Sequence, residues 1–241
     1  MSTARPLAGR LALVTGASRG IGAAVARRLA LSGARVALLA RNADALAALV
    51  AEIGEGAVAL VCDVRDTGAL SRALDSLPEL LGGAPGIVVN NAGAFFVAPA
   101  RDTSVDAFAA TLAVNLTAPF AVVRALLPAM SASRLGHVVT IGSIADRMAF
   151  PGNAAYAASK YGLRALHEVL RAELKASGVR VSLVSPGPVD TDLWNSIDPD
   201  QQAGFTPRSE MLSPESVAEA VHWVVTSPAG VNVDELRLSR S

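Results

Sequence analysis

Short runs of hydrophobic residues alternate with longer runs rich in alanine and leucine along most of this chain. The short runs are apolar at consecutive positions, which is typical of strands in a sheet covered on both faces. We predict strands at 11–15, 35–40, 57–61, 87–90, 137–141, 179–184 and 231–238. Stretches of helical length separate them and allow right-handed crossovers. The pattern predicts one α/β domain, residues 1–241, whose doubly wound parallel sheet of about seven strands has helices on both faces.

The segment after the first predicted strand has the clearest helical period. Ile21, Ala24, Val25, Arg28 and Leu29 follow the i, i+3, i+4, i+7, i+8 spacing of an amphipathic helix. Its apolar side chains are expected to face the sheet, with the stem of Arg28 at the edge of the stripe.

Composition and charge exclude several classes of protein. The 241 residues carry 21 basic and 21 acidic side chains, and this balance argues against a sequence-blind nucleic-acid binder. The single cysteine, Cys62, excludes an internal disulfide framework and a Cys-x-x-Cys metal site, and we expect no metal. We find no apolar run of the ~18 residues that span a bilayer. Residues 1–10 lack the long apolar stretch of a signal peptide, so a soluble cytoplasmic protein is expected.

A glycine-rich turn lies between the first strand and the first helix. Thr15 to Gly22 have the pattern Gly-x-x-x-Gly-x-Gly, with glycines at 16, 20 and 22. Glycine lets the backbone approach a pyrophosphate closely, and a helix N-terminus offers free N–H groups and a positive dipole end. The turn favours a Rossmann-type dinucleotide site, although ordinary strand-to-helix turns can be equally rich in glycine.

The end of the second strand indicates which nucleotide is bound. An acidic residue there is typical of a site for the ribose 2′-hydroxyl of NAD, whereas arginine accommodates the 2′-phosphate of NADP. Here the strand ends in Ala40-Arg41-Asn42, and Arg19 in the glycine-rich turn can reach the same corner. A guanidinium binds phosphate through two N–H groups. These residues favour NADP(H), unless both arginines are simply solvated surface groups.

A tyrosine and a lysine four residues apart are candidates for proton transfer. Tyr156 and Lys160 fall on one face of a predicted helix. A nearby ammonium favours the phenolate and lowers the pKa of tyrosine from about 10. Tyr156 could then protonate a developing alkoxide. Ser143, after the fifth strand, could bind the same oxygen. Such a pair is often only structural, so this spacing alone does not decide its role.

Together these motifs resemble the short-chain dehydrogenase/reductase family in its single-domain form. The resemblance covers about residues 8–225. It rests on Thr15-Gly16-(three residues)-Gly20-Ile21-Gly22, Asn90-Asn91-Ala92-Gly93, Asn115, Ser143 and Tyr156-(three residues)-Lys160, in that order.

The resemblance implies roles for individual residues. It assigns catalysis to Asn115, Ser143, Tyr156 and Lys160, with Asn115 holding a water of a proton relay and Lys160 binding the nicotinamide ribose. Asp63 is expected at the adenine, and the segment 186–191 at the nicotinamide carboxamide. The full set expected at NADP(H) is Gly16, Ser18, Arg19, Gly20, Ile21, Gly22, Arg41, Asn42, Asp63, Val64, Asn91, Ala92, Gly93, Tyr156, Lys160, Pro186, Gly187, Val189 and Thr191.

The expected reaction is hydride transfer from NADPH to a ketone or aldehyde carbonyl, with Tyr156 as the proton donor. The substrate is expected to contact Ser143, Ala145, Phe95, Phe150, Tyr156 and Trp194. Residues 192–212 are polar, rich in turn residues and placed to form a mobile lid, although a plain surface loop would have the same composition. Arg147 could face a substrate carboxylate.

Three other functions stay open. A 3-oxoacyl-thioester reductase would carry out the same chemistry, but residues 233–241 lack the glycine-rich tail frequent in such enzymes. A catalytically silent NADP-binding sensor usually lacks the tyrosine. A sugar-nucleotide isomerase or dehydratase usually needs a longer C-terminal part.

The helices expected around 108–130 and 154–176 carry an excess of apolar side chains: Leu112, Leu116, Phe120, Val123, Leu163, Leu166 and Leu170. The family resemblance implies a homodimer or homotetramer formed through these helices. Packing against the sheet must nevertheless account for most of these apolar side chains.

Overall fold

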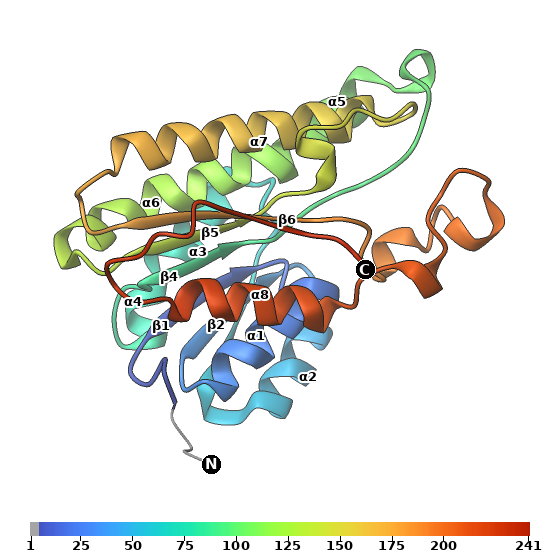
Figure 1. The fold of residues 1–241 in the computed structure, drawn as a ribbon. Helices are drawn as coiled ribbons and strands as arrows, with labels where there is room; N and C mark the ends of the chain where they lie inside the picture. The colour runs from blue at the N-terminus through green and yellow to red at the C-terminus, as the bar shows by residue number, and fades with distance from the viewer. Residues whose placement is uncertain (1–4) are drawn as a thin grey trace.

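The computed structural model describes residues 5–241 and has a central parallel sheet (Figure 1). The sheet has seven strands in the order β3-β2-β1-β4-β5-β6-β7. The strands are β1 (Leu11–Thr15), β2 (Arg35–Ala40), β3 (Ala57–Val61), β4 (Ile87–Asn90), β5 (His137–Ile141), β6 (Arg180–Pro186) and β7 (Glu235–Leu238). The order reverses between β1 and β4, so the predicted Rossmann-type doubly wound fold is confirmed.

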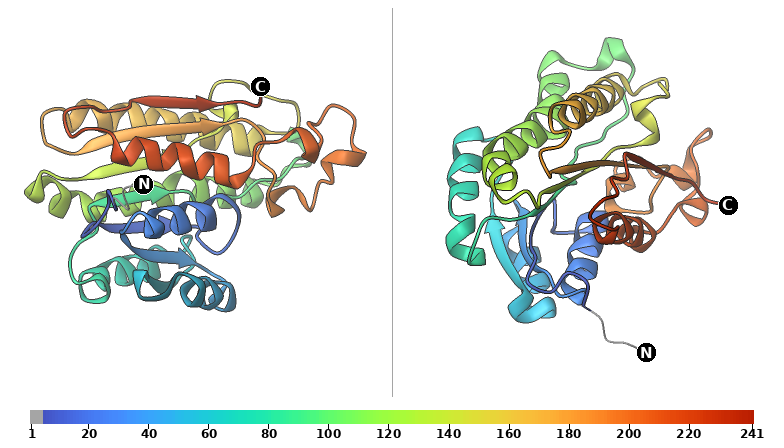
Figure 2. Two further views of the ribbon diagram at one scale, coloured as in Figure 1. Left: turned by 60° about the horizontal axis from the view of Figure 1, so that its bottom comes forward. Right: turned by 60° about the vertical axis from the view of Figure 1, so that its left-hand side comes forward.

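Helices cover both faces of the sheet (Figure 2). They are α1 (Gly20–Leu31), α2 (Ala43–Ile53), α3 (Thr67–Asp75), α4 (Leu77–Leu81), α5 (Val105–Leu112), α6 (Ala118–Ser133), α7 (Ala154–Glu173) and α8 (Pro214–Thr226). A π-helical turn, Ala113–Thr117, joins α5 to α6.

Successive strand residues enter two separate hydrophobic cores. Ala12 and Val14 of β1 pack in the core under α1, α2 and α8, whereas Leu13 packs in the core under α3, α4, α6 and α7. All three side chains are fully buried. This alternation explains why the strands are apolar at consecutive positions.

The predicted and observed strands differ mainly at the C-terminal edge. The first five predictions match the structure, but β6 runs from Arg180 to Pro186, and β7 begins at Glu235 instead of at 231. The Asn232 side chain explains the later start of β7. It accepts a 2.9 Å hydrogen bond from the Val181 N–H and donates a 3.0 Å bond to the Val181 carbonyl oxygen. A side-chain amide therefore takes the place that a strand backbone would occupy.

One helical run is longer and more apolar than the sequence suggested. Residues 105–133 are continuously helical, with a mean hydropathy of 1.6 over the most apolar stretch, so length and composition alone would allow a membrane span. The side chains of Val122, Val123, Leu126 and Met130 in this run are buried in the core under the sheet. The helix predicted around residues 108–130 is thus a few residues longer at each end, and π-helical geometry keeps it continuous through Asn115.

The carboxyl ends of β1, β4, β5 and β6 meet at one edge of the sheet, where ligands bind in folds of this type. The chain leaves that edge after β6 and projects from the body as residues 190–212 (Figure 1). This segment contains short 3₁₀ turns at Asp192–Trp194, Pro199–Gln201 and Arg208–Glu210.

Candidate active site

The glycine-rich turn between β1 and α1 has no room for side chains at two of its glycines. A Cβ at Gly22 would lie 2.2 Å from the Gly16 carbonyl oxygen, and one at Gly16 would lie 2.8 Å from Ala92 Cα. Gly16 also has a φ of +66°, in the left-handed region that favours glycine. Helix α1 then begins with no side-chain cap and no acidic residue in its first turn. Its first N–H groups therefore remain free to bind an anion.

The motif Asn90-Asn91-Ala92-Gly93 at the end of β4, which we call the asparagine turn, supports this glycine-rich turn. Asn91 Nδ2 donates hydrogen bonds to the carbonyl oxygens of Thr15 (2.9 Å) and Gly16 (3.2 Å). The Thr15 hydroxyl accepts 3.0 Å bonds from the N–H groups of Asn91 and Ala92. The structure therefore brings together these two motifs, which lie about 75 residues apart in the chain.

The segment after β6 meets the same turn. A Cβ at Gly20 would lie 3.1 Å from the Thr191 methyl carbon. Val189 is buried, and the Gly187 N–H donates to the Leu238 carbonyl oxygen at 2.8 Å. Residues 186–191 thus pass beside the N-terminus of α1.

The side chains expected at the adenosine end have partners of their own. Arg19 and Arg41 are exposed, and Arg19 Nη1 lies 3.6 Å from Asp192 Oδ2. Hydrogen bonds from Arg65 hold the pKa of the Asp63 carboxyl below its usual range, and the charge of Arg41 adds to this effect. Asn42 accepts a 3.0 Å bond from the Ala45 N–H and caps α2. The side chain of Asn42 therefore already has a structural role.

Tyr156 and Lys160 lie one turn apart on α7. Lys160 Nζ is 5.6 Å from the centre of the Tyr156 ring and donates a 3.0 Å hydrogen bond to the Ile141 carbonyl oxygen, at the end of β5. Burial lowers the pKa of Lys160 to about 8, although the charge of Asp146 opposes this shift. The lysine is therefore held against the strand end that leads to Ser143.

The pKa of Tyr156 moves in the direction opposite to the sequence-based expectation. Burial raises it, hydrogen bonding with the Ser143 side chain partly opposes the rise, and the charge of Asp146 adds to it. The expected lowering by Lys160 is not what this structure shows, because the cost of burying the charged phenolate is the largest effect on this pKa.

Asn115 lies in the π-helical turn between α5 and α6 and is fully buried. Its Nδ2 donates to the Ala94 carbonyl oxygen and to Ser159 Oγ, each at 2.9 Å, while its Oδ1 accepts a 2.8 Å bond from the Ala94 N–H. Single-turn π-bulges occur frequently at functional sites. Here the bulge turns Asn115 toward the helix that carries Tyr156.

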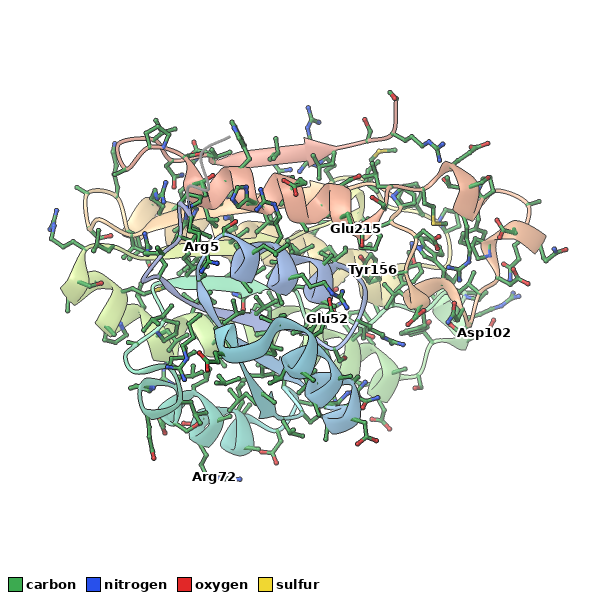
Figure 3. All side chains as sticks on the ribbon, turned by 90° about the horizontal axis from the view of Figure 1, so that it is seen from below. Arg5, Glu52, Arg72, Asp102, Tyr156 and Glu215 are labelled. Carbon is green, nitrogen blue, oxygen red and sulfur yellow. The ribbon has the colours of Figure 1, made fainter. Side chains whose placement is uncertain are left out.

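A row of four aromatic rings extends from Tyr156 into the projecting segment, and we call it the aromatic row. Phe95 lies 4.7 Å from Tyr156 and 5.1 Å from Trp194, and Trp194 lies 6.1 Å from Phe205, between ring centres. Figure 3 labels Tyr156, right of centre and on the side of the molecule from which the segment 192–212 projects. Of the other predicted substrate contacts, Ala145 is buried, and Phe150 is exposed and outside this row.

Residues 10–202 match the family model described as short chain dehydrogenase. The chain belongs to the short-chain dehydrogenase family. It is 34% identical over 233 residues to the NADP-dependent 3-hydroxy acid dehydrogenase YdfG of Salmonella typhi, and the alignment covers 95% of this chain and 94% of that protein. It is 37% identical over 237 residues to glycine betaine reductase ATRR of Emericella nidulans, but spans 19% of that protein's length.

A solved structure agrees with this assignment. A metagenomic short-chain oxidoreductase in complex with NADP is 35% identical, with a TM-score of 0.84 over 98% of this chain and 99% of that one. The predicted family and fold are therefore confirmed.

In this short-chain dehydrogenase, sequence reasoning missed two buried polar residues beside the site. Ser159 is fully buried and lies between Asn115 and the Tyr156 carbonyl oxygen, to which it donates a 2.7 Å bond. Asp146 is 1% exposed. The available signals were weak: a serine between Tyr156 and Lys160, and an isolated acid three residues after Ser143.

Arg147 has a different role from the one considered from the sequence. Its Nε donates to Asp146 at 2.7 Å, and its Nη1 lies 2.5 Å from Glu235 on β7. It therefore pairs with two carboxylates of the protein. Within residues 5–241, no cluster of three or more His, Cys, Asp or Glu side chains is arranged to bind a metal.

Proposed function

We propose that this protein is an NADP(H)-dependent oxidoreductase that reduces a ketone or aldehyde carbonyl to an alcohol, with Tyr156 as the proton donor. The observation that carries this proposal is that Tyr156, at one end of the aromatic row, hydrogen bonds with the Ser143 side chain and lies one helical turn from Lys160. A relative described as NADP-dependent and a related structure with bound NADP support the cofactor.

The residues present fit a dinucleotide. Glycine at 16 and 22 lets the turn pack closely against its own backbone and against Asn91. The start of α1, where a pyrophosphate would bind, has no side-chain cap that would occupy its N–H groups. Arg19 and Arg41 would bind a 2′-phosphate, since β2 ends without a carboxylate. The predicted contacts from Asp63, Asn91, Lys160 and the segment 186–191 complete this proposal. When bound, NADPH supplies a hydride for the carbonyl carbon.

The chain's own groups would manage one proton. A raised pKa keeps the Tyr156 phenol protonated until negative charge develops on the substrate oxygen, and the phenol then gives its proton to that oxygen. The Ser143 hydroxyl would hold the same oxygen. Lys160 and Asn115 would position Tyr156 and its helix, and Asn115 would hold a water through which the proton is replaced.

The aromatic row supports a predominantly apolar substrate. Phe95 packs against the Tyr156 ring, and Trp194 packs against Phe95. The indole Nε1 of Trp194 donates a 3.0 Å bond to the Val189 carbonyl oxygen, which fixes the ring. Residues 192–212 would act as a lid because they carry Trp194 and Phe205 into this row. The relative's description as a 3-hydroxy acid dehydrogenase favours 3-hydroxy acids and their 3-oxo products as a second class to test.

A homodimer or homotetramer is part of this proposal. Phe120 on α6 and Val169 on α7 are 49% and 52% exposed, whereas Val123, Leu163 and Leu170 of the same helices are buried against the body. A two-fold contact between two copies of these helices would cover the exposed side chains.

The test is a screen of NADPH oxidation with ketones, aldehydes, quinones and 3-oxoacyl thioesters, together with NADP⁺ reduction by 3-hydroxy acids. We expect Tyr156→Phe to abolish turnover while NADPH binding, followed by fluorescence, stays nearly unchanged. Tyr161→Phe is the matched control, because Tyr161 is the only other tyrosine and is 44% exposed.

Three results would change the assignment. Turnover confined to thioesters would identify a 3-oxoacyl-thioester reductase. NADPH binding without turnover of any substrate would favour a sensor. Full activity of Tyr156→Phe would reject the proposed proton donor.

A further inference from the structure

The carboxylate of Asp146 is almost fully buried and is fixed by neighbours on three elements. The Ser185 hydroxyl, on β6, donates a 2.5 Å hydrogen bond to Oδ2, and Arg147 Nε donates a 2.7 Å bond to Oδ1. Arg164 Nη1, on α7, lies 3.8 Å from the same Oδ1. A buried carboxylate is costly unless charge and hydrogen bonds compensate it, so this arrangement specifies one position for Asp146.

This carboxylate lies directly against the strand end that carries the candidate catalytic groups. A Cβ at Gly142 would lie 2.9 Å from Asp146 Oδ2 and 2.5 Å from Ser185 Oγ, so only glycine fits there. Gly142 separates Ile141, whose carbonyl oxygen accepts from Lys160, from Ser143. Asp146 is thus packed against the short stretch that holds both Lys160 and Ser143.

The same cluster joins the active-site loop to the C-terminal strand. Glu235 on β7 lies 2.5 Å from Arg147 Nη1 and 3.6 Å from Arg164 Nη2. The two arginines therefore bridge two carboxylates, one buried beside the site and one at the edge of the sheet. The elements joined are the loop after β5, helix α7 and strand β7.

We propose that Asp146 is a positioning residue for the proton donor: its buried carboxylate fixes the loop that carries Ser143 and places a negative charge beside the strand end that holds Lys160. This inference rests on the proposed function, because it gives Asp146 a role in the same proton transfer. It assigns the Arg147–Glu235 pair to holding that carboxylate in place.

Every element packed around Asp146 contributes a charged or polar side chain. On its own loop it faces Arg147. On α7 it faces Arg164, with Glu168 bonded to Arg164 at 3.0 Å, and Lys160 and Tyr156 lie beyond. Strand β6 contributes the neutral Ser185, and β7 contributes Glu235, with Arg237 3.9 Å from it.

The electrostatic effect has the same sign at both candidate catalytic groups. The charge of Asp146 raises the pKa of Tyr156, in addition to the larger effect of burial, and it opposes the lowering of the pKa of Lys160 by burial. Loss of this charge, with the amide shape retained, is therefore expected to make Tyr156 ionise at lower pH.

The chain offers a test that needs no substrate. It has only two tyrosines, so in a Tyr161→Phe background the ultraviolet absorbance of phenolate reports Tyr156 alone. We expect Asp146→Asn to lower the titration midpoint by about half a pH unit or more. Glu173→Gln is the matched control, because it removes one negative charge at the end of α7, about 25 Å along the helix from Tyr156. It should leave the midpoint unchanged.

Circular dichroism at each pH would show whether the variants stay folded. A folded Asp146→Asn variant whose Tyr156 midpoint equals that of the parent overturns the proposal. Should Asp146→Asn fail to fold, Glu235→Gln decides, because Glu235 is 30% exposed and its loss leaves more of the positive charge of Arg147 uncompensated. A smaller downward shift supports the proposal, and no shift overturns it. A shifted midpoint in a protein that reduces no carbonyl would reject the proposed function and leave only the electrostatic effect of Asp146 on Tyr156.

Discussion

Asn115 is linked to Tyr156 through a single buried hydroxyl. Asn115 Nδ2 donates a 2.9 Å hydrogen bond to Ser159 Oγ, and Ser159 donates a 2.7 Å bond to the Tyr156 carbonyl oxygen. Asn115 and Ser159 are both fully buried. The π-helical turn is therefore bonded to the first turns of α7, and the position of the phenol depends on a residue from a different helix.

We expect Asn115→Ala to reduce both stability and turnover. The change leaves the Ala94 N–H and carbonyl groups without their partner, at a cost of up to about 1–3 kcal/mol for each group left unpaired. The Ser159 hydroxyl loses its bond from Asn115 but keeps the one that it donates to the Tyr156 carbonyl oxygen. Denaturant unfolding and the rate of carbonyl reduction would measure the two effects. Ser159→Ala removes only one of these bonds to Asn115 and should lose less stability. Equal stability of Asn115→Ala and the parent would contradict this reading.

A second prediction concerns the close packing of the glycine-rich turn. A methyl group at Gly22 would lie 2.2 Å from the Gly16 carbonyl oxygen and 2.5 Å from Asn91 Nδ2, so Gly22→Ala must displace backbone. We expect a loss of about 1–3 kcal/mol in unfolding free energy and a marked loss of NADPH affinity. Calorimetric titration would measure the affinity. Gly230→Ala is the control, because a Cβ there meets nothing within 4 Å. Unchanged NADPH binding by Gly22→Ala would place the cofactor elsewhere.

Cofactor choice is the third prediction. Arg41→Asp replaces an exposed cation at the end of β2 with the acidic group typical of NAD sites, so the ratio of kcat/KM for NADPH over NADH should fall at least tenfold. Arg101→Asp makes the same charge change on an arginine that is 87% exposed and lies outside the proposed site. If both substitutions alter the ratio equally, the effect belongs to net charge and not to a 2′-phosphate site.

The sequence allowed a good prediction of the fold and of the main motifs. Five strands match their predicted bounds, because parallel strands that are buried on both faces consist of consecutive apolar residues. The glycine-rich turn and the segment Asn91 to Gly93 were both predicted to contact NADP(H), and in the structure Asn91 donates a hydrogen bond to the Gly16 carbonyl oxygen. Local sequence patterns were sufficient for features that a single strand or turn determines, such as strand bounds and the glycine-rich turn.

The parts that sequence missed depend on contacts between distant segments. The burial of Asp146 depends on Ser185 and Arg164, which lie 39 and 18 residues away along the chain. The π-helical turn at Asn115 has no distinctive residue pattern. The direction of the pKa shift of Tyr156 also required the structure, because burial outweighs the effect expected from a lysine one turn away.

The last prediction concerns acid stability and His137, the first residue of β5. This side chain is 1% exposed, and its Nε2 is within 2.8 Å of the Ser182 hydroxyl. Burial, together with the charges of Arg180 and Arg10, lowers its pKa from 6.5 to about 3. Between these two pH values the unfolded chain binds a proton at His137 that the folded chain does not. Above pH 6.5 neither state binds it and the protein keeps its full free energy of unfolding, and that free energy falls progressively as the pH falls toward 3.

The full loss is on the order of 4–5 kcal/mol at pH 3. His137→Gln cannot bind that proton, so its unfolding free energy should decline less steeply than that of the parent between pH 6.5 and 3. Urea unfolding at a series of pH values would measure both curves, and their difference isolates His137 from the carboxyl groups that titrate in the same range. His222→Gln should give a smaller difference, because His222 is only partly buried and is bonded to Arg28. Parallel curves for His137→Gln and the parent would show that His137 is not held neutral in the folded protein.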